Sequence, residues 1–305
     1  MAFTRIRFAS KEHVVTEYPE ITFNDLPQYS QVPVRILDLV DAQVRSKTPA
    51  EVTREFDGEK WQEVRNWIDD DPAIRYSDVD DRRLGHLGPQ PFFQDGRFHL
   101  LPLVEAHARH VALCAGTMRR YAKEASALVE LGAGYGSTIL GVHHATGFSG
   151  LPLYAAEYSP VGVGTIRDLA RNSALTIRAG KCDFYSSTMD DLGIPAGSLI
   201  FTSYAAHYVP QLTTDFFRMI SALRPAAVFH FEPCLEHYAR NTIHGLMCRR
   251  YAQMNDYNQN LVSLLYMQKE QGVLDIIEER PVVMGANPLL PISVLGWKPR
   301  LSATI

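Results

Sequence analysis

The sequence predicts an α/β protein built on a mostly parallel sheet. Three observations lead to this prediction: apolar runs alternate with helical segments from residue 127 onward, alternate glycines follow the first of these runs, and the last two runs have no long helix between them. Alternating strands and helices are typical of parallel strands with crossover helices, whereas strands joined by a short connection pair antiparallel. We therefore expect a parallel sheet that ends in an antiparallel hairpin.

Seven strands are expected, and each is an apolar run of strand length. They fall at residues 127–131, 153–157, 176–182, 198–203, 227–231, 274–278 and 292–297. Only the segment 280–291, which contains Pro, Gly and Asn, separates the last two, so these two form the expected hairpin.

A mainly helical N-terminal cap over residues 1–102 is expected in front of a sheet domain at 103–305, which begins with a helix over 103–123. Apolar pieces of the cap are short and interrupted by prolines. One acidic helical segment is expected from about Ala50 to Ile68. The polar stretch 76–96 is either a lid over a substrate site or a surface connection.

The first expected strand runs directly into Glu130-Leu131-Gly132-Ala133-Gly134-Tyr135-Gly136-Ser137. Glycines at such a turn leave backbone amides free to face a ligand. The dinucleotide fingerprint G-x-G-x-x-G requires its third glycine at position 137, where this chain has Ser137. Glu130 also disfavours a pyrophosphate, but it is a charge-assisted partner for the ammonium of an amino-acid group.

With these residues the segment resembles motif I of the class I S-adenosylmethionine-dependent methyltransferases: an apolar strand, an acidic residue, an apolar residue and G-x-G-x-G. S-adenosylmethionine carries an ammonium and no phosphate. The resemblance covers about residues 105–305. It implies a Rossmann-like sheet with strand order 3-2-1-4-5-7-6 and an enzyme that uses S-adenosylmethionine as its cofactor.

In a doubly wound sheet the ligand lies beyond the carboxyl ends of the strands, so the residues that end each strand are candidates for cofactor binding. After the first strand, the resemblance implies that Gly132, Gly134 and Gly136 allow close approach of the methionine part of the cofactor. It also implies that Glu130 holds the ammonium of that part.

The second and third strands supply the candidates for the adenosine part. Glu157, at the end of the second strand, is expected to accept hydrogen bonds from both ribose hydroxyls. Asp183 and Phe184 resemble the acidic and apolar pair that accepts from the adenine amino group and covers its ring. Asp190 and Asp191 are alternatives to Asp183.

The segments after the fourth and fifth strands hold the candidate catalytic groups. His207 is the first choice, because the ordinary pKa of histidine, near 6.5, suits a proton acceptor. Glu232, at the rim of the fifth strand, is the second candidate, as a base or as a group that orients the substrate. Four other side chains of these segments are candidates for substrate binding: Tyr204, Tyr208, Glu236 and His237.

No metal site is expected. His230, Glu232, His237 and His244 are the only cluster to consider, and their spacing matches no compact ligand motif. The four cysteines are isolated in the sequence, which disfavours a disulfide framework and a structural zinc site.

Composition restricts the partners. The net charge of -4 lacks the basic footprint of a nucleic-acid binder, so a small-molecule or peptide substrate is expected. No run of about 18 apolar residues occurs and the N-terminus lacks a leader pattern, so we expect no membrane association and a cytoplasmic location. The oligomeric state stays open, with a homodimer as one option.

The expected reaction is in-line methyl transfer to an O or N nucleophile of a small molecule, sugar or peptide, with help from a general base. Residues 201–233 resemble bacterial methyltransferases of natural-product or polysaccharide biosynthesis. Two other classes stay open: a nucleotide-binding oxidoreductase on the same layered sheet, and a non-catalytic scaffold that binds S-adenosylmethionine. Fold alone does not separate them.

Overall fold

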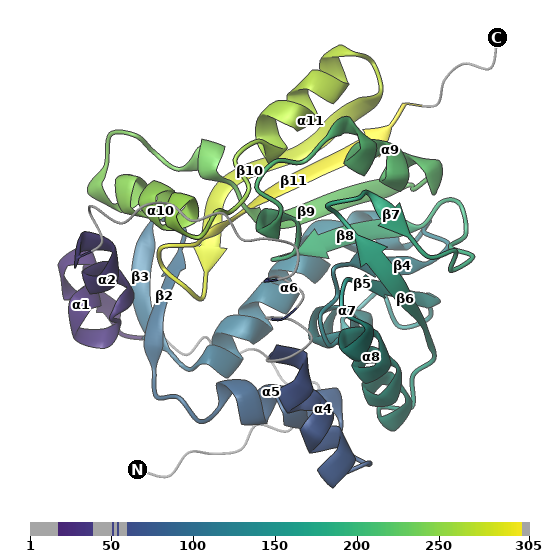
Figure 1. Ribbon diagram of the computed structural model, residues 1–305, viewed down its shortest axis with the longest axis horizontal. Helices are drawn as coiled ribbons and strands as arrows, with labels where there is room; N and C mark the ends of the chain where they lie inside the picture. The colour runs from purple at the N-terminus through teal and green to yellow at the C-terminus, as the bar shows by residue number, and fades with distance from the viewer. Residues whose placement is uncertain (1–17, 39–50, 52–53, 55–59, 301–305) are drawn as a thin grey trace.

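A computed structural model of the protein describes residues 18–38, 51, 54 and 60–300, and this part of the chain forms one mixed sheet of eleven strands (Figure 1). The order across the sheet is β1-β3-β2-β10-β11-β9-β8-β4-β5-β6-β7. The strands are β1 (Glu20–Ile21), β2 (Gln90–Gln94), β3 (Arg97–Leu101), β4 (Leu128–Leu131), β5 (Leu153–Glu157), β6 (Ile177–Asp183), β7 (Thr188–Met189), β8 (Leu199–Ser203), β9 (Ala227–Pro233), β10 (Leu274–Gly285) and β11 (Ile292–Pro299).

The prediction of a seven-stranded sheet is wrong in the number of strands. All seven predicted segments are strands, but β7 adds to one edge of the sheet and β1, β3 and β2 add to the other. The central strands β6, β5, β4, β8 and β9 are parallel, as an alternation of strands and helices requires. The predicted antiparallel hairpin is confirmed, since β10 pairs antiparallel with β11.

Helices cover both faces of the sheet (Figure 1). Successive residues of a buried strand point to opposite faces, so Leu199 and Phe201 of β8 pack in one core with α6 and α7, whereas Ile200 packs in a second core with α9 and α11. The α-helices are α1 (Leu26–Tyr29), α2 (Val32–Asp38), α4 (Trp61–Asp70), α5 (Tyr76–Leu84), α6 (Leu103–Ala122), α7 (Ser137–His144), α8 (Pro160–Asn172), α9 (Thr214–Ala222), α10 (Ile243–Met254) and α11 (Leu261–Glu270), and the 3₁₀ turns are η1 (Phe23–Asp25), η3 (Ala206–Tyr208) and η4 (Leu235–His237).

The described part of the N-terminal region contains four helices and also three strands that the sequence did not predict, so a mainly helical cap is not confirmed. The hairpin of β2 and β3 continues the sheet, because Met284 and Gly285 of β10 pair with the end of β2. The polar stretch 76–96, expected to be a lid or a surface connection, instead contains α5 and β2. Of the helix expected from about Ala50 to Ile68, the part from Trp61 is present, and most of the earlier part lies outside the described residues.

The turn between β2 and β3 explains the hairpin. Asp95 and Gly96 both have positive φ, at 48° and 85°. A two-residue Asp-Gly turn of this kind matches the twist of the flanking strands.

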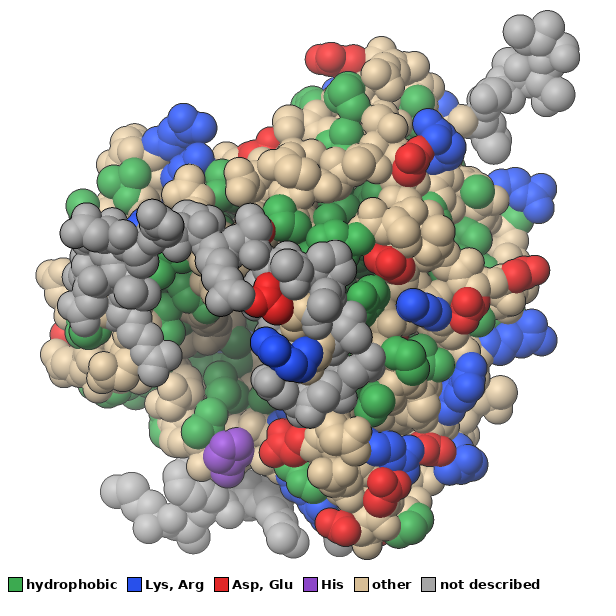
Figure 2. Space-filling view, viewed as in Figure 1, with side chains coloured by type: hydrophobic (Ala, Val, Ile, Leu, Met, Phe, Trp, Pro, Cys, Tyr) green, Lys and Arg blue, Asp and Glu red, His purple; other side chains and the backbone are tan. Residues whose placement is uncertain are grey.

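Acidic and basic side chains are interspersed over the face seen in Figure 2, with no gathering of one sign there.

We predict that the hairpin is an integral part of the fold. Leu101 of β3 is fully buried in the main core, so Leu101→Ala is expected to lower the free energy of unfolding by about 2–5 kcal/mol, measured by urea denaturation. Leu87→Ala is the matched control, because Leu87 is 43% exposed and its truncation should cost little. Equal small losses for both variants would mean that the hairpin is detachable.

Candidate functional site

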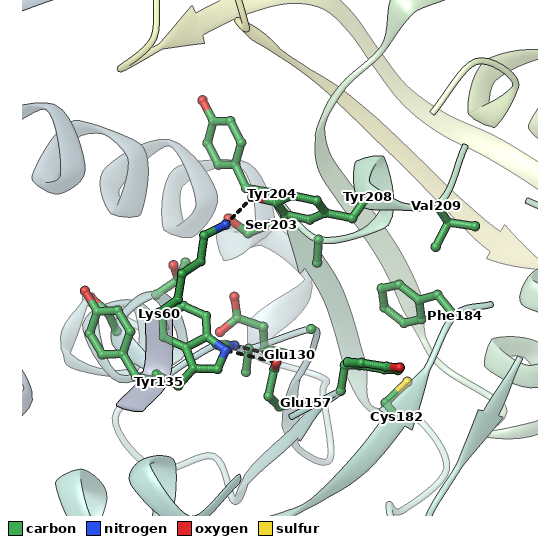
Figure 3. A pocket seen from close by; sticks show the side chains of 18 of the residues that line it. Lys60, Glu130, Tyr135, Glu157, Cys182, Phe184, Ser203, Tyr204, Tyr208 and Val209 are labelled. Carbon is green, nitrogen blue, oxygen red and sulfur yellow. Dashed lines mark hydrogen bonds between the residues drawn. The ribbon is translucent and has the colours of Figure 1, made fainter. Parts of the chain in front are cut away.

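A cavity of about 360 Å³ lies at the carboxyl ends of the parallel strands (Figure 3). Residues at four strand ends line it: Glu130 of β4, Glu157 of β5, Cys182 of β6 and Ser203 of β8. Ligands of open α/β sheets bind at this edge, where the strand order reverses. The volume falls in the ~300–1,000 Å³ range of small-molecule sites.

The glycine-rich loop forms the floor of the cavity. Gly132 has a φ of 76°, and a Cβ added to it would lie 2.3 Å from the Cβ of Ala205, so only glycine fits there. Gly134 has a φ of 59°, and an added Cβ would lie 3.0 Å from the ring of Trp61. Gly132 and Gly134 line the cavity. Gly136 does not line the cavity. It lies directly before α7, and a Cβ added to it would lie 3.3 Å from Ile166 of α8.

The carboxylate of Glu157 binds the glycine-rich loop. Its Oε2 accepts a hydrogen bond from the Gly134 N–H at 2.8 Å, and its Oε1 accepts from the Ser159 N–H at 3.2 Å. The indole N–H of Trp61 also donates to Oε1, at 3.3 Å (Figure 3). Burial raises the pKa of Glu157 to about 7, although these N–H donors act in the opposite direction.

Glu130 lines the cavity but is 1% exposed. Its Oε2 accepts a hydrogen bond from the Ile139 N–H of α7 at 2.9 Å. Burial raises the pKa of Glu130 well above its usual range, and the charges of Glu157 and Glu232 add to this effect. A bound ammonium would favour the ionised form of Glu130.

The two residues expected at the adenine end are placed differently. Phe184 lines the cavity together with Tyr158 and Tyr185. Asp183 does not line it, because its Oδ1 accepts hydrogen bonds from the Tyr185 N–H at 2.8 Å and the Ser186 N–H at 3.3 Å and so holds the turn after β6. Neither alternative, Asp190 or Asp191, lines the cavity.

Glu232 and His207 form a buried pair beneath the cavity wall. The Oε2 of Glu232 lies 3.2 Å from His207 Nδ1, and the Glu232 carboxylate also accepts hydrogen bonds from the N–H groups of Ala205, Ala206 and His207. Burial alone would raise the pKa of Glu232, but His207 and the backbone donors lower it overall. Glu232 is 0% and His207 2% exposed, and neither lines the cavity.

This placement gives the pair a structural task. The bonds from Glu232 hold the backbone at 205–207, and Ala205 and Tyr208 of this segment line the cavity. Tyr204 also lines the cavity and has a φ of 48°, a left-handed backbone that is rare for a tyrosine and typical of strained functional turns.

The other two residues predicted to bind substrate lie elsewhere. Glu236 accepts hydrogen bonds from the N–H groups of Val262 and Ser263 and so caps the start of α11. His237 lies between Ser293, at 2.8 Å from Nδ1, and Glu279, at 3.1 Å from Nε2. Neither residue lines the cavity.

Residues of the N-terminal region and of α6 complete the cavity, and they were not among the candidate site residues predicted from the sequence. Lys60 and Trp61 reach it from the start of α4, Arg83 from α5 and His107 from α6. The Arg83 guanidinium carbon lies 5.4 Å from the ring centre of Trp61 and 5.2 Å from that of Tyr135. Trp61 falls in the segment from about Ala50 to Ile68 that was expected to be helical, and Arg83 falls in the polar stretch 76–96.

Within the described residues, no group of three His, Cys, Asp or Glu is placed to hold a metal ion. None of the described helices has the length and apolar character needed to cross a membrane.

No family model matches the chain, and no curated protein matches it. It is similar to several solved structures. PigF, solved with SAH, is 16% identical over 88% of this chain and 69% of its own, with a TM-score of 0.48. The methyltransferase domain of bacterial CtHen1-C is 10% identical over 63% of this chain and 98% of its own, with a TM-score of 0.43.

A third solved structure is geranyl diphosphate C-methyltransferase from Streptomyces coelicolor A3(2), in complex with Mg²⁺, geranyl-S-thiolodiphosphate and S-adenosyl-L-homocysteine. It is 12% identical over 62% of this chain and 76% of its own, with a TM-score of 0.44. At such low identity, the function of this chain follows from its own site.

The raised pKa of Glu157 predicts a pH-dependent stability. The unfolded carboxyl loses its proton near pH 4.5 and the folded one near pH 7, so between these values the folded state binds more protons and stability falls as pH rises. Glu157→Gln cannot titrate, so it should not show this decrease in the free energy of unfolding, which is on the order of 3 kcal/mol. Urea denaturation at pH 5 and pH 8 measures the difference. Exposed Glu124→Gln is the control, and parallel pH slopes for wild type and Glu157→Gln would contradict the prediction.

The structural task of Glu232 gives a second prediction. Glu232→Gln breaks a buried charged pair and should lower the free energy of unfolding by about 3–5 kcal/mol in urea denaturation. Glu236→Gln disturbs only a helix cap and should cost about 1 kcal/mol. A loss below that of the Glu236 variant would refute a structural role for Glu232 and return it to the candidate bases.

Proposed function

We propose that the protein is an S-adenosylmethionine-dependent methyltransferase that acts on an O or N nucleophile of a small molecule or peptide. One observation carries this proposal: a single cavity joins the glycine-rich loop to the Glu157 carboxylate. Along it lie Glu130 for an ammonium, Glu157 for a ribose diol, and Tyr158 and Phe184 for a purine ring.

The acidic groups next to the glycine-rich loop favour this cofactor over a dinucleotide, and the two cations that line the cavity, Lys60 and Arg83, come from other segments. Glu130 and Glu157 line the cavity next to the glycine-rich loop. A pyrophosphate on this loop would face both carboxylates. Ser137, at the position of the third fingerprint glycine, carries a hydroxyl that is bonded to Asp80 at 2.8 Å.

Glu157 has a limited capacity for a diol. A carboxylate offers about four acceptor sites, and N–H groups of Gly134, Ser159, Tyr158 and Trp61 all bond to this one. Ribose hydroxyls therefore need the site that Trp61 holds. Cofactor binding should thus release the indole N–H of Trp61 from Glu157, while the glycine-rich loop stays bonded.

S-adenosylmethionine, when bound, supplies a methyl group already activated by a sulfonium. The chain therefore has three tasks: to bind, to orient the acceptor and to accept a proton. The Gly132 and Gly134 backbone fits the methionine part, because at both positions a side chain would collide with a neighbour. Tyr204 and Tyr208, on the wall held by Glu232, are placed to position the acceptor.

Calorimetry with purified protein tests the cofactor. S-adenosylmethionine and S-adenosylhomocysteine are expected to bind with micromolar affinity, and Glu157→Ala should weaken both by about ten-fold or more because the diol loses its acceptor. Glu157→Gln, which keeps one acceptor oxygen, should lie between the two, and Glu124→Ala should bind like wild type.

NADH and NADPH are titrated in parallel. Binding of either one in place of S-adenosylmethionine would establish the oxidoreductase alternative. If none of the four compounds binds to wild-type protein that circular dichroism shows to be folded, the proposal is wrong.

A further inference from the structure

A chain of hydrogen bonds connects three helices behind the glycine-rich loop. The Ser137 hydroxyl, at the start of α7, lies 2.8 Å from both oxygens of Asp80 on α5. The same hydroxyl lies 2.7 Å from Nε2 of His107 on α6. The Tyr135 hydroxyl donates to Asp80 Oδ1 at 2.7 Å. Asp80 is 8% and Ser137 5% exposed, so water competes little for these bonds.

These bonds determine where the proton of His107 lies. The single hydroxyl proton of Ser137 goes to the Asp80 carboxylate, which can only accept. Ser137 therefore accepts from His107, and Nε2 must carry the proton. In a neutral imidazole the other nitrogen is then an acceptor. Nδ1 of His107 makes no hydrogen bond with a described residue, and His107 lines the cavity.

We propose that His107, aligned by Ser137 and Asp80, is the general base that takes the proton of the methyl acceptor. This inference rests on the proposed function and names the residue that serves it. His107 shares the cavity with Glu130, which would receive the cofactor ammonium, and with Ser203 at the end of β8. The Ser137 hydroxyl that His107 bonds lies two residues before Ile139, whose N–H binds Glu130, so the base lies near the carboxylate that would receive the ammonium.

The lone pair of the acceptor O or N forms the new bond to the methyl carbon, and the carbon–sulfur bond breaks with its electron pair on sulfur, giving a neutral thioether. The acceptor proton passes to Nδ1 of His107. The resulting imidazolium keeps its Nε2 hydrogen bond to Ser137, and the Asp80 carboxylate, 3.7 Å from Nε2, stabilises the positive charge.

The groups around His107 favour a neutral base before the reaction. Burial lowers the pKa of His107, and Asp80 opposes this shift. His110, one turn along α6, donates to or accepts from Ser203 at 2.7 Å, and burial lowers its pKa to about 3. Arg83 of α5 and Lys60 before α4 are the cations that line the same cavity, and Glu130 is its acid on β4.

His207 lacks these properties. Its Nδ1 faces Glu232, and its ring lies 4.1 Å from that of Tyr208 and 4.8 Å from that of Tyr257, measured between ring centres. It does not line the cavity. The base expected from the sequence therefore belongs to the wall, and the histidine that borders the cavity comes from the helix before the glycine-rich loop.

Nitrogen NMR tests the arrangement without any turnover. In protein with ¹⁵N-labelled histidine at neutral pH, His107 is expected as the Nε2–H tautomer, assigned by the signal that His107→Gln removes. Ser137→Ala takes away the acceptor and should abolish the tautomer preference. An Nδ1–H tautomer or an imidazolium at pH 7.5 overturns the proposal, whether or not the cofactor binds.

Turnover tests the chemical role. Methyl transfer from S-adenosylmethionine is measured on a probe set of a phenol, a carboxylic acid and a primary amine, with S-adenosylhomocysteine as the product followed. His107→Gln should lower kcat by about 10²-fold to 10⁴-fold and leave the Kd of S-adenosylhomocysteine nearly unchanged. His86→Gln changes an exposed histidine in the turn after α5 that does not line the cavity, and this variant should keep full activity.

The pH profile separates a base from a structural residue. Because burial lowers the pKa of His107, wild-type kcat/KM should fall in a pH range below the ordinary histidine value of about 6.5, and Ser137→Ala should shift this range. A His107→Gln variant that keeps both kcat and this fall with pH overturns the proposal. Failure of the wild type to bind S-adenosylhomocysteine counts against the proposed function instead, and the tautomer of His107 is decided by NMR in that case too.

Discussion

Three buried carboxylates at the ends of parallel strands hold the site together. Glu130, Glu157 and Glu232 each accept backbone N–H groups from the segment that borders the cavity: Glu130 from α7, Glu157 from the glycine-rich loop, and Glu232 from the residues after β8. A buried carboxylate without such donors would cost several kcal/mol. Because the loops depend on the carboxylates and the carboxylates on the loops, the backbone of these loops is held in place before any ligand arrives.

The three carboxylates differ in how many further hydrogen bonds they can accept. Glu232 already has a histidine and three backbone donors, so its pKa is lowered and it is no receptor for a proton or a ligand. Glu130 has one backbone donor among the hydrogen bonds described, and burial raises its pKa, so an incoming cation would find an acceptor. Position at a strand end is therefore not enough to make a carboxylate a ligand-binding group, because Glu130 and Glu157 line the cavity whereas Glu232 does not.

Much of the fold could be predicted because local patterns determine it. The apolar runs of the parallel strands and the missing helix between β10 and β11 are sequence signals, and the structure follows them. The β2–β3 hairpin was missed because Pro91 and the surrounding polar residues resemble a loop, although Asp95-Gly96 between two apolar runs is a hairpin signal. The site was predicted less completely. Gly132, Gly134 and Glu157 follow from a motif, whereas Trp61 and His107 reach the cavity through packing between segments far apart in sequence.

The packing of the N-terminal region against the sheet domain affects the proposed catalysis. Asp80 lies on α5 and Ser137 on α7, so the orientation of His107 depends on contacts between the N-terminal region and the sheet domain. Trp61 of α4 reaches the same cavity and shares Glu157 with the glycine-rich loop. The cofactor site and the proposed base therefore form only when both regions are folded against each other. A region that continues the sheet through β2 and β3 provides this more reliably than a hinged lid, because its position is set by core packing and by the β2–β10 pairing.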